Sequence, residues 1–429
     1  MAVVFHRVTV ADGVTAPRAD VDVVMTDGQI ADIRPSKATG VTGSVVAAGG
    51  YLVPGLVDSH VHFSGDDHVN EVVALLHVMH GVTNVQCMNG SPAVLDLRAR
   101  IAAGETIGPR VWTTGPAQND PELDRATGRA RALEQARAGY DAIKVYNDLT
   151  RDGFKGLVEG AAAGGIPVVG HVVRDVGLAG TLASPQQHIA HLEELIYTGL
   201  GFDLNRLMQP DPVTIDVTVV NDLARDLVAA GPTVCTSIEA LMTAGAQVRD
   251  AATWCARRDV RQLPMVLRSA WAPPNNEYAN RFTDPRHVRA FGRLAALAGQ
   301  LAYQLHARRV PIVAGTDALL CGVAPGISLH RELRYLTEVG LTPADAVRTA
   351  LPLPLSLPGD PPRQLEVGAP ADIVLLDGNP FDSLTRFDHI RGVVIGGKWL
   401  DATRLRDRLN QLSSVDRGIV RIQSEAATW

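Results

Sequence analysis

The sequence predicts an α/β protein, a (β/α)8 TIM barrel with a small β-sandwich domain formed by both termini. Three observations lead to this prediction. Short apolar runs alternate with helical segments through the middle of the chain, and β-branched stretches broken by Asp-Gly and Gly-Gly turns occupy both ends. The 429 residues exceed one small domain and suit a barrel of about 250 residues with a smaller partner domain.

Both ends of the chain predict short strands. The stretches VVFHRVTVADG, ADVDVVMTDGQIADIRP and SVVAAGGYLVPG near the start alternate apolar and polar residues, and ADIVLLDGNP and HIRGVVIGGKWLD repeat the pattern near the end. We therefore expect residues 1–54 and 360–402 to form one composite β-sandwich domain. Residues 403–429, rich in arginine and then polar, are expected to form a helix and a tail.

The middle of the chain, residues 55–359, predicts the barrel. Eight apolar runs separated by helical segments are visible: YLVPGLVDSH, GVTNVQCM, RVWTTG, DAIKVY, IPVVGH, HIAH, GPTVCTSI and VPIVAGTD. Near-continuous apolar strands that alternate with helices are typical of a parallel sheet covered on its faces. In such a barrel the active site lies at the carboxyl ends of the strands. The long links at residues 192–231 and 238–310 are expected to form lids or pocket walls.

Composition and charge exclude several classes of protein. With 46% hydrophobic and 20% charged residues, the chain is neither disordered, collagen-like nor a disulfide scaffold. The net charge of −6 offers no bulk attraction to nucleic acid or to an anionic membrane. No apolar run is long enough to span a bilayer, and the start lacks the pattern of a signal peptide, so we expect a cytoplasmic protein. The four cysteines form no CxxC pair and are predicted to be reduced: Cys87, Cys235, Cys255 and Cys321.

Candidate metal ligands end several of the predicted strands. The first run ends in His60 and His62, and a spacing of two on an extended segment places both imidazoles on one face, where both can reach one metal ion. His171, His191 and Asp317 end the fifth, sixth and eighth runs. Each histidine could instead be an ordinary strand residue, and Asp317 could cap the following segment. The metal interpretation rests on their coincidence at one end of one predicted barrel.

Lys144, inside AIKVY, ends the fourth run. Only four of the 40 basic residues are lysines: Lys37, Lys144, Lys155 and Lys398. Lys144 could be a lysine that extends its ammonium group out of a strand end. A position that keeps lysine in an arginine-biased chain nevertheless suggests a chemical role.

With these residues at its strand ends, the sequence resembles the amidohydrolase superfamily, in the branch with a binuclear metal centre and a carboxylated lysine. The resemblance covers nearly the whole chain, from VVAAGGYLVPGLVDSHVHF through GVTNVQ, IKVY, GIPVVGH, HIAHLEEL and VAGTDA to LEVGAPADIVLLDGNPFD. The subgroup it resembles contains imidazolonepropionase-like enzymes, Xaa-Pro dipeptidases and ochratoxin hydrolases.

The resemblance implies two divalent metal ions, with zinc favoured and manganese or cobalt as alternatives. It also implies a hydroxide that bridges the two ions. The implied ligands are His60 and His62 on the more buried ion, His171 and His191 on the second, Lys144 as a bridge after carboxylation by carbon dioxide, and Asp317 on the first ion and beside the hydroxide.

These implied roles are chemically consistent. A carbamate forms only on an unprotonated primary amine, which arginine lacks, and this accounts for a lysine at position 144. Two metal ions acidify a shared water and polarise a substrate carbonyl. Asp317 can accept the proton of the attacking hydroxide and deliver it to the leaving atom.

The substrate-binding residues are harder to predict. Dipeptidase-like members carry a GGH-type loop after the third strand, whereas WTTGPAQND runs directly into PELDRATGR here and contains no histidine. Tyr197 could polarise the scissile carbonyl or pack in a loop, and Arg174 could bind a substrate carboxylate or lie on the surface. His68 could line the pocket. Trp271 and Tyr278 could form an aromatic pocket wall or the core of a lid.

The sequence therefore predicts a hydrolase that cleaves an amide bond in a dipeptide-like or N-acyl amino acid substrate. The alternative is a lactone or cyclic amide ring-opening hydrolase with the same binuclear site. Deamination of a heterocycle is disfavoured, because deaminases of this superfamily usually use one metal without the carboxylated lysine. A non-catalytic scaffold ranks last, because all six ligands are retained. The expected partner is a small-molecule substrate, and family members often form homo-oligomers.

Overall fold

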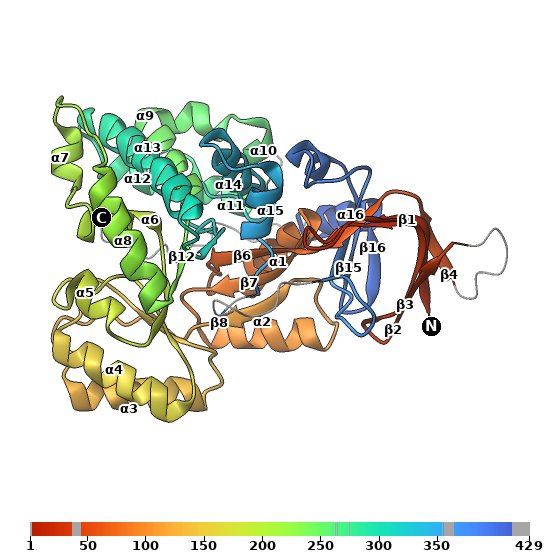
Figure 1. Ribbon diagram of the computed structural model, residues 1–429, viewed down its shortest axis with the longest axis horizontal. Helices are drawn as coiled ribbons and strands as arrows, with labels where there is room; N and C mark the ends of the chain where they lie inside the picture. Colours follow the sequence, from red (N-terminus) through yellow and green to blue (C-terminus); the bar gives the residue numbers. More distant parts are fainter. Residues whose placement is uncertain are drawn as a thin grey trace.

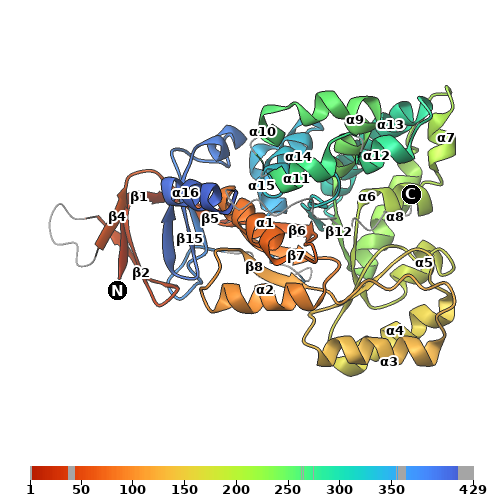
Figure 2. The ribbon, with the colours of Figure 1, turned by 180° about the vertical axis from the view of Figure 1, so that it is seen from behind.

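The computed structural model describes residues 2–36, 44–261, 263, 265–273, 275–353, 355 and 364–413 (Figure 1). The predicted boundary at residue 360 and the predicted tail beyond residue 413 lie outside this set. In Figures 1 and 2 the strands from the two chain ends gather on one side of the molecule, and the helices α3 to α13 occupy the other. The parallel strands β6 to β8 lie between these two regions.

The strands from the two chain ends pair with each other in one eight-stranded sheet. Its order is β16-β15-β14-β5-β1-β2-β3, with β4 paired to β1, and Ile373 of β14 lies opposite Pro54 of β5. The strands are hydrogen-bonded into a single sheet, and the finer prediction that this domain is a β-sandwich stays a prediction. Their bounds are β1 Val3–Val10, β2 Arg18–Thr26, β3 Gln29–Pro35, β4 Ser44–Ala48, β5 Tyr51–Pro54, β14 Ile373–Leu376, β15 Ile390–Ile395 and β16 Lys398–Asp401.

Each of the eight predicted apolar runs of the middle region contains or borders a parallel strand. Three strands form the sheet β6-β7-β8, and five form the sheet β13-β12-β11-β10-β9. Isolated parallel bridges join their edges, with Thr114 paired to Ala142 on one side and Val61 paired to Ala318 on the other. The bounds are β6 Leu56–Val61, β7 Val82–Cys87, β8 Arg110–Thr113, β9 Ile143–Val145, β10 Val168–Gly170, β11 Gln186–Ile189, β12 Thr233–Cys235 and β13 Ile312–Val313.

Helices fill the links between the parallel strands. The two long links hold α6 to α8 before β12 and α9 to α13 before β13. Their bounds are α1 Asp67–Met79, α2 Pro92–Ala102, α3 Arg125–Arg137, α4 Arg151–Gly164, α5 Gly177–Leu182, α6 Leu192–Thr198, α7 Leu204–Met208, α8 Val217–Ala230, α9 Ile238–Cys255, α10 Arg258–Arg261, α11 Met265–Trp271, α12 Glu277–Arg281, α13 Arg286–Ala307, α14 Ile327–Glu338, α15 Pro343–Thr349 and α16 Ala402–Ser413, with a 3-10 helix at Leu384–His389.

Local chemistry explains where several helices begin. The side chains of Asp66, Asp124 and Thr150 each accept a hydrogen bond from a backbone N–H in the first turn of α1, α3 and α4. These caps satisfy N–H groups that have no partner within the helix. Each helix therefore starts shortly after the strand or loop that precedes it, which keeps the strand ends free to carry functional side chains.

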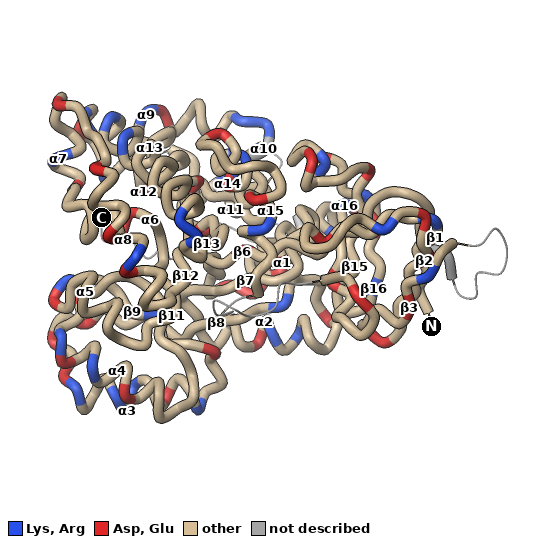
Figure 3. Tube along the Cα trace, in the orientation of Figure 1, with Lys and Arg blue, Asp and Glu red and all other residues tan. Residues whose placement is uncertain are grey.

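The surface carries charges of both signs. Basic and acidic residues both lie along α3 and α4 (Figure 3). The four cysteines are free thiols, as predicted from their spacing. Among the described residues, no helix combines the length and the hydropathy that crossing a membrane requires.

Candidate metal centre

Asp317 lies at the centre of a cluster of histidines. Its Oδ1 atom is 2.8 Å from His62 Nε2 and 3.3 Å from His60 Nε2, and its Oδ2 atom is 3.9 Å from His191 Nε2. His60 is in β6, His62 follows that strand, and Asp317 follows β13 with a backbone φ of 62°. The Asp317 N–H donates to the carbonyl of His60 at 2.9 Å. The backbone itself therefore holds these two strand ends side by side.

His171 and His191 approach from the next strands. The ring of His191 lies 4.3 Å from the ring of His60 and 5.1 Å from that of His171, centroid to centroid. His171 follows Gly170, which has a φ of 125° and where a Cβ atom would lie 2.3 Å from the Val145 carbonyl oxygen. Glycine is required at this position because the strand end adopts a backbone that other residues rarely take and passes close to β9.

Lys144 belongs to the same cluster. Its side chain is fully buried, and its Nζ atom lies 3.4 Å from His60 Nε2 and 4.7 Å from the centre of the Tyr146 ring. A buried amine this close to the histidine cluster differs from the alternative of a lysine that extends to solvent. The structure thus brings all six sequence-predicted ligands into one buried region at the carboxyl ends of the parallel strands.

The donor atoms fit a divalent metal ion. Ligand atoms of His60, His191 and Asp317 lie within 4.8 Å of one another, and all three residues are buried. A further ring nitrogen, His171 Nε2, is buried without a hydrogen-bond partner among the described residues. Buried polar atoms without partners are rare, and a metal ion is one group that satisfies them. Imidazole and carboxylate donors suit zinc and similar ions.

The electrostatics of the cluster favour metal-binding protonation states. Burial lowers the pKa values of His60 and His191 well below their ordinary value, and the nearby Lys144 lowers them further. Burial alone would raise the pKa of Asp317, but His191 and His62 outweigh it, so that the pKa lies below its usual range. Neutral imidazoles beside an ionised carboxylate are the forms that bind divalent cations.

Sequence reasoning missed two residues that position the ligands. His171 Nδ1 donates to Oε1 of Glu194 at 2.8 Å, and the backbone N–H of Val172 donates to the other oxygen at 3.0 Å. This carboxylate fixes the tautomer of His171 and leaves its Nε2 atom facing the cluster. Tyr146 stacks on the His171 ring at 4.2 Å. The available signal was their spacing, since Glu194 follows His191 by three residues and Tyr146 follows Lys144 by two.

Tyr197 and Arg174, two candidates for substrate binding, have very different surroundings. The hydroxyl of Tyr197 is buried and has no hydrogen-bond partner among the residues described. Burial and the nearby Glu193 raise the pKa of that hydroxyl well above its usual value, so it stays protonated. Arg174 has a side chain that is 58% exposed and forms an ion pair with Asp148 at 2.8 Å. Arg174 thus matches the surface alternative.

Trp271, His68 and Tyr278, the other three candidates, lie in helical segments, and Tyr278 is buried in α12. Trp271 is buried, contacts Trp254 edge to face at 6.4 Å, and accepts a hydrogen bond at its carbonyl from Asn276. These contacts match the core of a helical lid. His68 is half-buried in the first turn of α1.

Comparison with curated proteins finds one partial similarity. No protein-family model matches the chain. An adenine deaminase from Deinococcus radiodurans is 30% identical over 141 residues, which are 32% of this chain and 24% of the deaminase. The matched part therefore spans about a quarter of that relative.

Comparison with solved structures covers nearly the whole chain. Bottromycin amidohydrolase superposes with a TM-score of 0.71 and 25% identity, over 96% of this chain and 89% of that one. Phenylurea hydrolase B matches with a TM-score of 0.67 and 20% identity over 95% and 98%, and A. niger ochratoxinase with 0.65 and 18% over 93% and 95%. The last two similarities show the fold, and the similarity to bottromycin amidohydrolase supports a hydrolase that acts on carbon–nitrogen bonds. In fold the chain is thus similar to members of the amidohydrolase superfamily, and it carries a candidate metal cluster at the ends of its parallel strands.

Proposed function

We propose that the chain is a metal-dependent hydrolase that cleaves an amide bond in a dipeptide-like or N-acyl amino acid substrate. The observation that carries this proposal is the meeting of His60, His62 and His191 at the two oxygens of Asp317. His171 and Lys144 extend the same buried cluster. The similarity to bottromycin amidohydrolase over nearly the whole chain supports the same reaction class.

The proposal includes the architecture around the site. We propose that β6 to β13 close into a (β/α)8 barrel within residues 55–359, because isolated bridges join both edges of the two parallel sheets. The eight-stranded sheet supports a separate domain drawn from residues 1–54 and 360–402. In this arrangement every proposed ligand lies at the carboxyl ends of the strands, where active sites of such barrels occur.

The six proposed ligands would hold two divalent ions, and their imidazole and carboxylate donors favour zinc. Bound there, the ions supply the Lewis acidity that activates water and polarises an amide carbonyl. Lys144 would contribute as a carbamate, formed when its neutral amine bonds to the carbon of CO2 and releases one proton. Its full burial favours the neutral amine that this reaction needs.

Asp317 would move the proton during hydrolysis. Its carboxylate is ionised and lies at the centre of the cluster, so it can accept a proton from the attacking water and then donate it to the leaving nitrogen. The buried, protonated hydroxyl of Tyr197 is the best supported of the predicted substrate contacts, because it has an unused donor to offer a carbonyl oxygen.

A library of dipeptides and N-acyl amino acids, assayed for amine release by the zinc-loaded protein, tests the function. We expect cleavage of one subset, loss of activity after chelation, and loss in Lys144→Ala. Arg225→Ala is the matched control, because Arg225 is an exposed cation whose ion pairs, within the described part of the chain, are with residues of its own helix. Full activity in the chelated protein or in Lys144→Ala would contradict the proposal.

The adenine deaminase similarity favours a second candidate, hydrolysis of a heterocycle or another ring substrate. The same library distinguishes it. If the metal-loaded protein releases no amine from linear amides, the next substrates to assay are lactones, cyclic amides and aminopurines. The burial of Lys144 beside His60 keeps the linear amide as the first choice, because it supports the carbamate-bridged pair of ions.

A further inference from the structure

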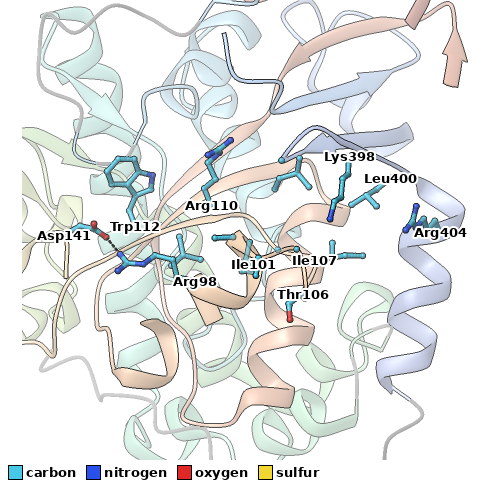
Figure 4. Close-up of a pocket in the computed structure, with 17 residues that line it drawn as sticks. Arg98, Ile101, Thr106, Ile107, Arg110, Trp112, Asp141, Lys398, Leu400 and Arg404 are labelled. Carbon is cyan, nitrogen blue, oxygen red and sulfur yellow. Dashed lines mark hydrogen bonds and ion pairs between the residues drawn. The ribbon is translucent and has the colours of Figure 1, made fainter. Parts of the chain in front are cut away.

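A cavity lies at the amino ends of the parallel strands, opposite the candidate metal centre. It has a volume of about 580 Å3 and is enclosed by α2, the loop after it, the start of β8 and the hairpin of β15 and β16 (Figure 4). Arg110 is the first residue of β8, and Asp141 precedes β9. The proposed metal ligands share no residue with this lining and follow the other ends of the strands. The cavity is therefore separate from the candidate metal centre.

The walls of this cavity are apolar. Ile101, Ile107, Val111 and Leu400 line it, with more apolar than polar surface exposed to the cavity. A cavity of this size is within the range that binds drug-sized molecules, and such sites combine apolar walls with a few polar groups that orient the ligand. The apolar lining favours a hydrocarbon or aromatic body.

The charges at the cavity are mainly positive. Four cations and one carboxylate line it. At one end Arg98 is neutralised by Asp141 at 2.9 Å (Figure 4). Arg110 pairs at 2.7 Å with Asp372, which lies outside the cavity lining. These two pairs leave the positive surplus to the other two cations.

Lys398 and Arg404 carry that surplus at the other end of the cavity (Figure 4). Within the described residues, neither side chain has an ion pair or a hydrogen bond. A Cβ atom on Gly104 would lie 2.5 Å from Lys398 Nζ, so glycine at this position leaves space for the ammonium group. Gly104 comes two residues after α2 ends, where the negative end of the helix dipole attracts a cation.

We propose that this cavity binds an amphipathic anion, with the hydrocarbon body against the apolar walls and a carboxylate or phosphate at Lys398 and Arg404. The two unpaired cations at one end define where the negative group lies, because the cations at the other end are already neutralised. An ammonium and a guanidinium together form charge-assisted hydrogen bonds to such a group. The site is independent of the proposed hydrolysis.

Binding of decanoate, below its micelle concentration, tests the proposal by calorimetry on the full chain. We expect one saturable site, with an affinity that falls about tenfold or more in the double variant Lys398→Ala/Arg404→Ala, because two charge-assisted contacts are lost. Both side chains are exposed, so the variant should fold. Decyl phosphate should show the same dependence, while 1-decanol should bind more weakly and equally to both proteins.

Two controls locate the site. The variant Arg225→Ala/Arg289→Ala removes the same charge from exposed positions outside the cavity and should bind decanoate as the unmodified chain does. Trp112→Phe should remove part of the ligand-dependent change in tryptophan fluorescence, because Trp112 lines the cavity. The proposal is wrong if decanoate shows no saturable binding, if the Lys398/Arg404 variant binds unchanged, or if the control double variant weakens binding equally.

Discussion

Charged side chains have opposite surroundings at the two ends of the parallel strands. At the carboxyl ends, Lys144 and Asp317 are buried and each lies within 3.4 Å of His60, whose pKa is lowered by burial. At the amino ends, Lys398 and Arg404 are exposed and lie beside apolar walls. Buried groups have perturbed protonation and suit chemistry, whereas exposed cations keep their charge and suit binding. In the two proposals, the same set of strands thus offers one end for reaction and the other for recognition.

Among the predictions that follow from this comparison, Asp317→Asn has the largest expected effect, a loss of turnover. The amide keeps the shape of the carboxylate but cannot carry a proton between water and the leaving nitrogen, so turnover should fall about 10^3-fold. Steady-state kinetics on the best substrate of the library checks this, with metal content measured on the same sample. A variant that keeps both metals and full turnover would remove Asp317 from the proposed mechanism.

Glu332 tests whether burial also determines the protonation state of a carboxyl group at the carboxyl ends of the strands. It accepts hydrogen bonds from the backbone N–H groups of Ile238 and Glu239 at the start of α9, and burial raises its pKa from 4.5 to about 7. Between these pH values the folded protein keeps a proton that the unfolded chain has released. Stability should therefore fall as pH rises from 4.5 to 7, by up to about 3 kcal/mol from this group.

Denaturant unfolding across that pH range measures the effect. Glu332→Gln should lower stability overall, because its amide cannot accept both N–H groups, but should flatten the slope with pH. Glu159→Gln is the matched control, since Glu159 is an exposed carboxylate on α4 paired with Arg125. An unchanged slope in Glu332→Gln would show that the hydrogen bonds, and not burial, set the protonation of this carboxylate.

Glu194→Gln should weaken metal binding by about 10- to 100-fold, because it loosens the tautomer and the orientation of His171. Competition with a chromogenic chelator measures the metal affinity, and Glu159→Gln again serves as the control. A positioning role also predicts that turnover recovers at saturating metal. If the affinity is unchanged, the hydrogen bond from His171 to Glu194 serves packing only.

The outcome for the sequence predictions follows from how local each signal is. The positions of His60, His171 and Asp317 at strand ends could be predicted, because the strands appear where the apolar runs are. A strand end places its side chain without reference to the rest of the fold. Glu194 was missed because its partner, His171, is 23 residues away, and only packing shows the contact. Arg174 was an ambiguous candidate because the sequence cannot show that Asp148 already pairs with it.

The same limit applies to the terminal sheet. Alternation predicted its strands and their joint origin in both chain ends, but the order in which they pair depends on contacts between Pro54 and Ile373, more than 300 residues apart. The cavity at Lys398 is an extreme case, since its lining comes from α2, β8, β16 and α16, and no single segment carries its signature. The scarcity of lysines was used to single out Lys144, and no prediction was made from the sequence for Lys398.

The smallest expected effect is that of a substitution at the metal centre on decanoate binding, and it tests both ends of the parallel strands in one experiment. Asp317→Asn should bind decanoate with an affinity within about twofold of that of the unmodified chain, because none of the proposed metal ligands lines the distal cavity. Calorimetry on the metal-loaded proteins measures this. A carboxylate such as decanoate can also coordinate a metal ion, so a large loss of affinity in Asp317→Asn would place the binding at the metal end and contradict the cavity proposal. Unchanged affinity in this variant, with reduced affinity in Lys398→Ala/Arg404→Ala, would establish that the two ends act separately.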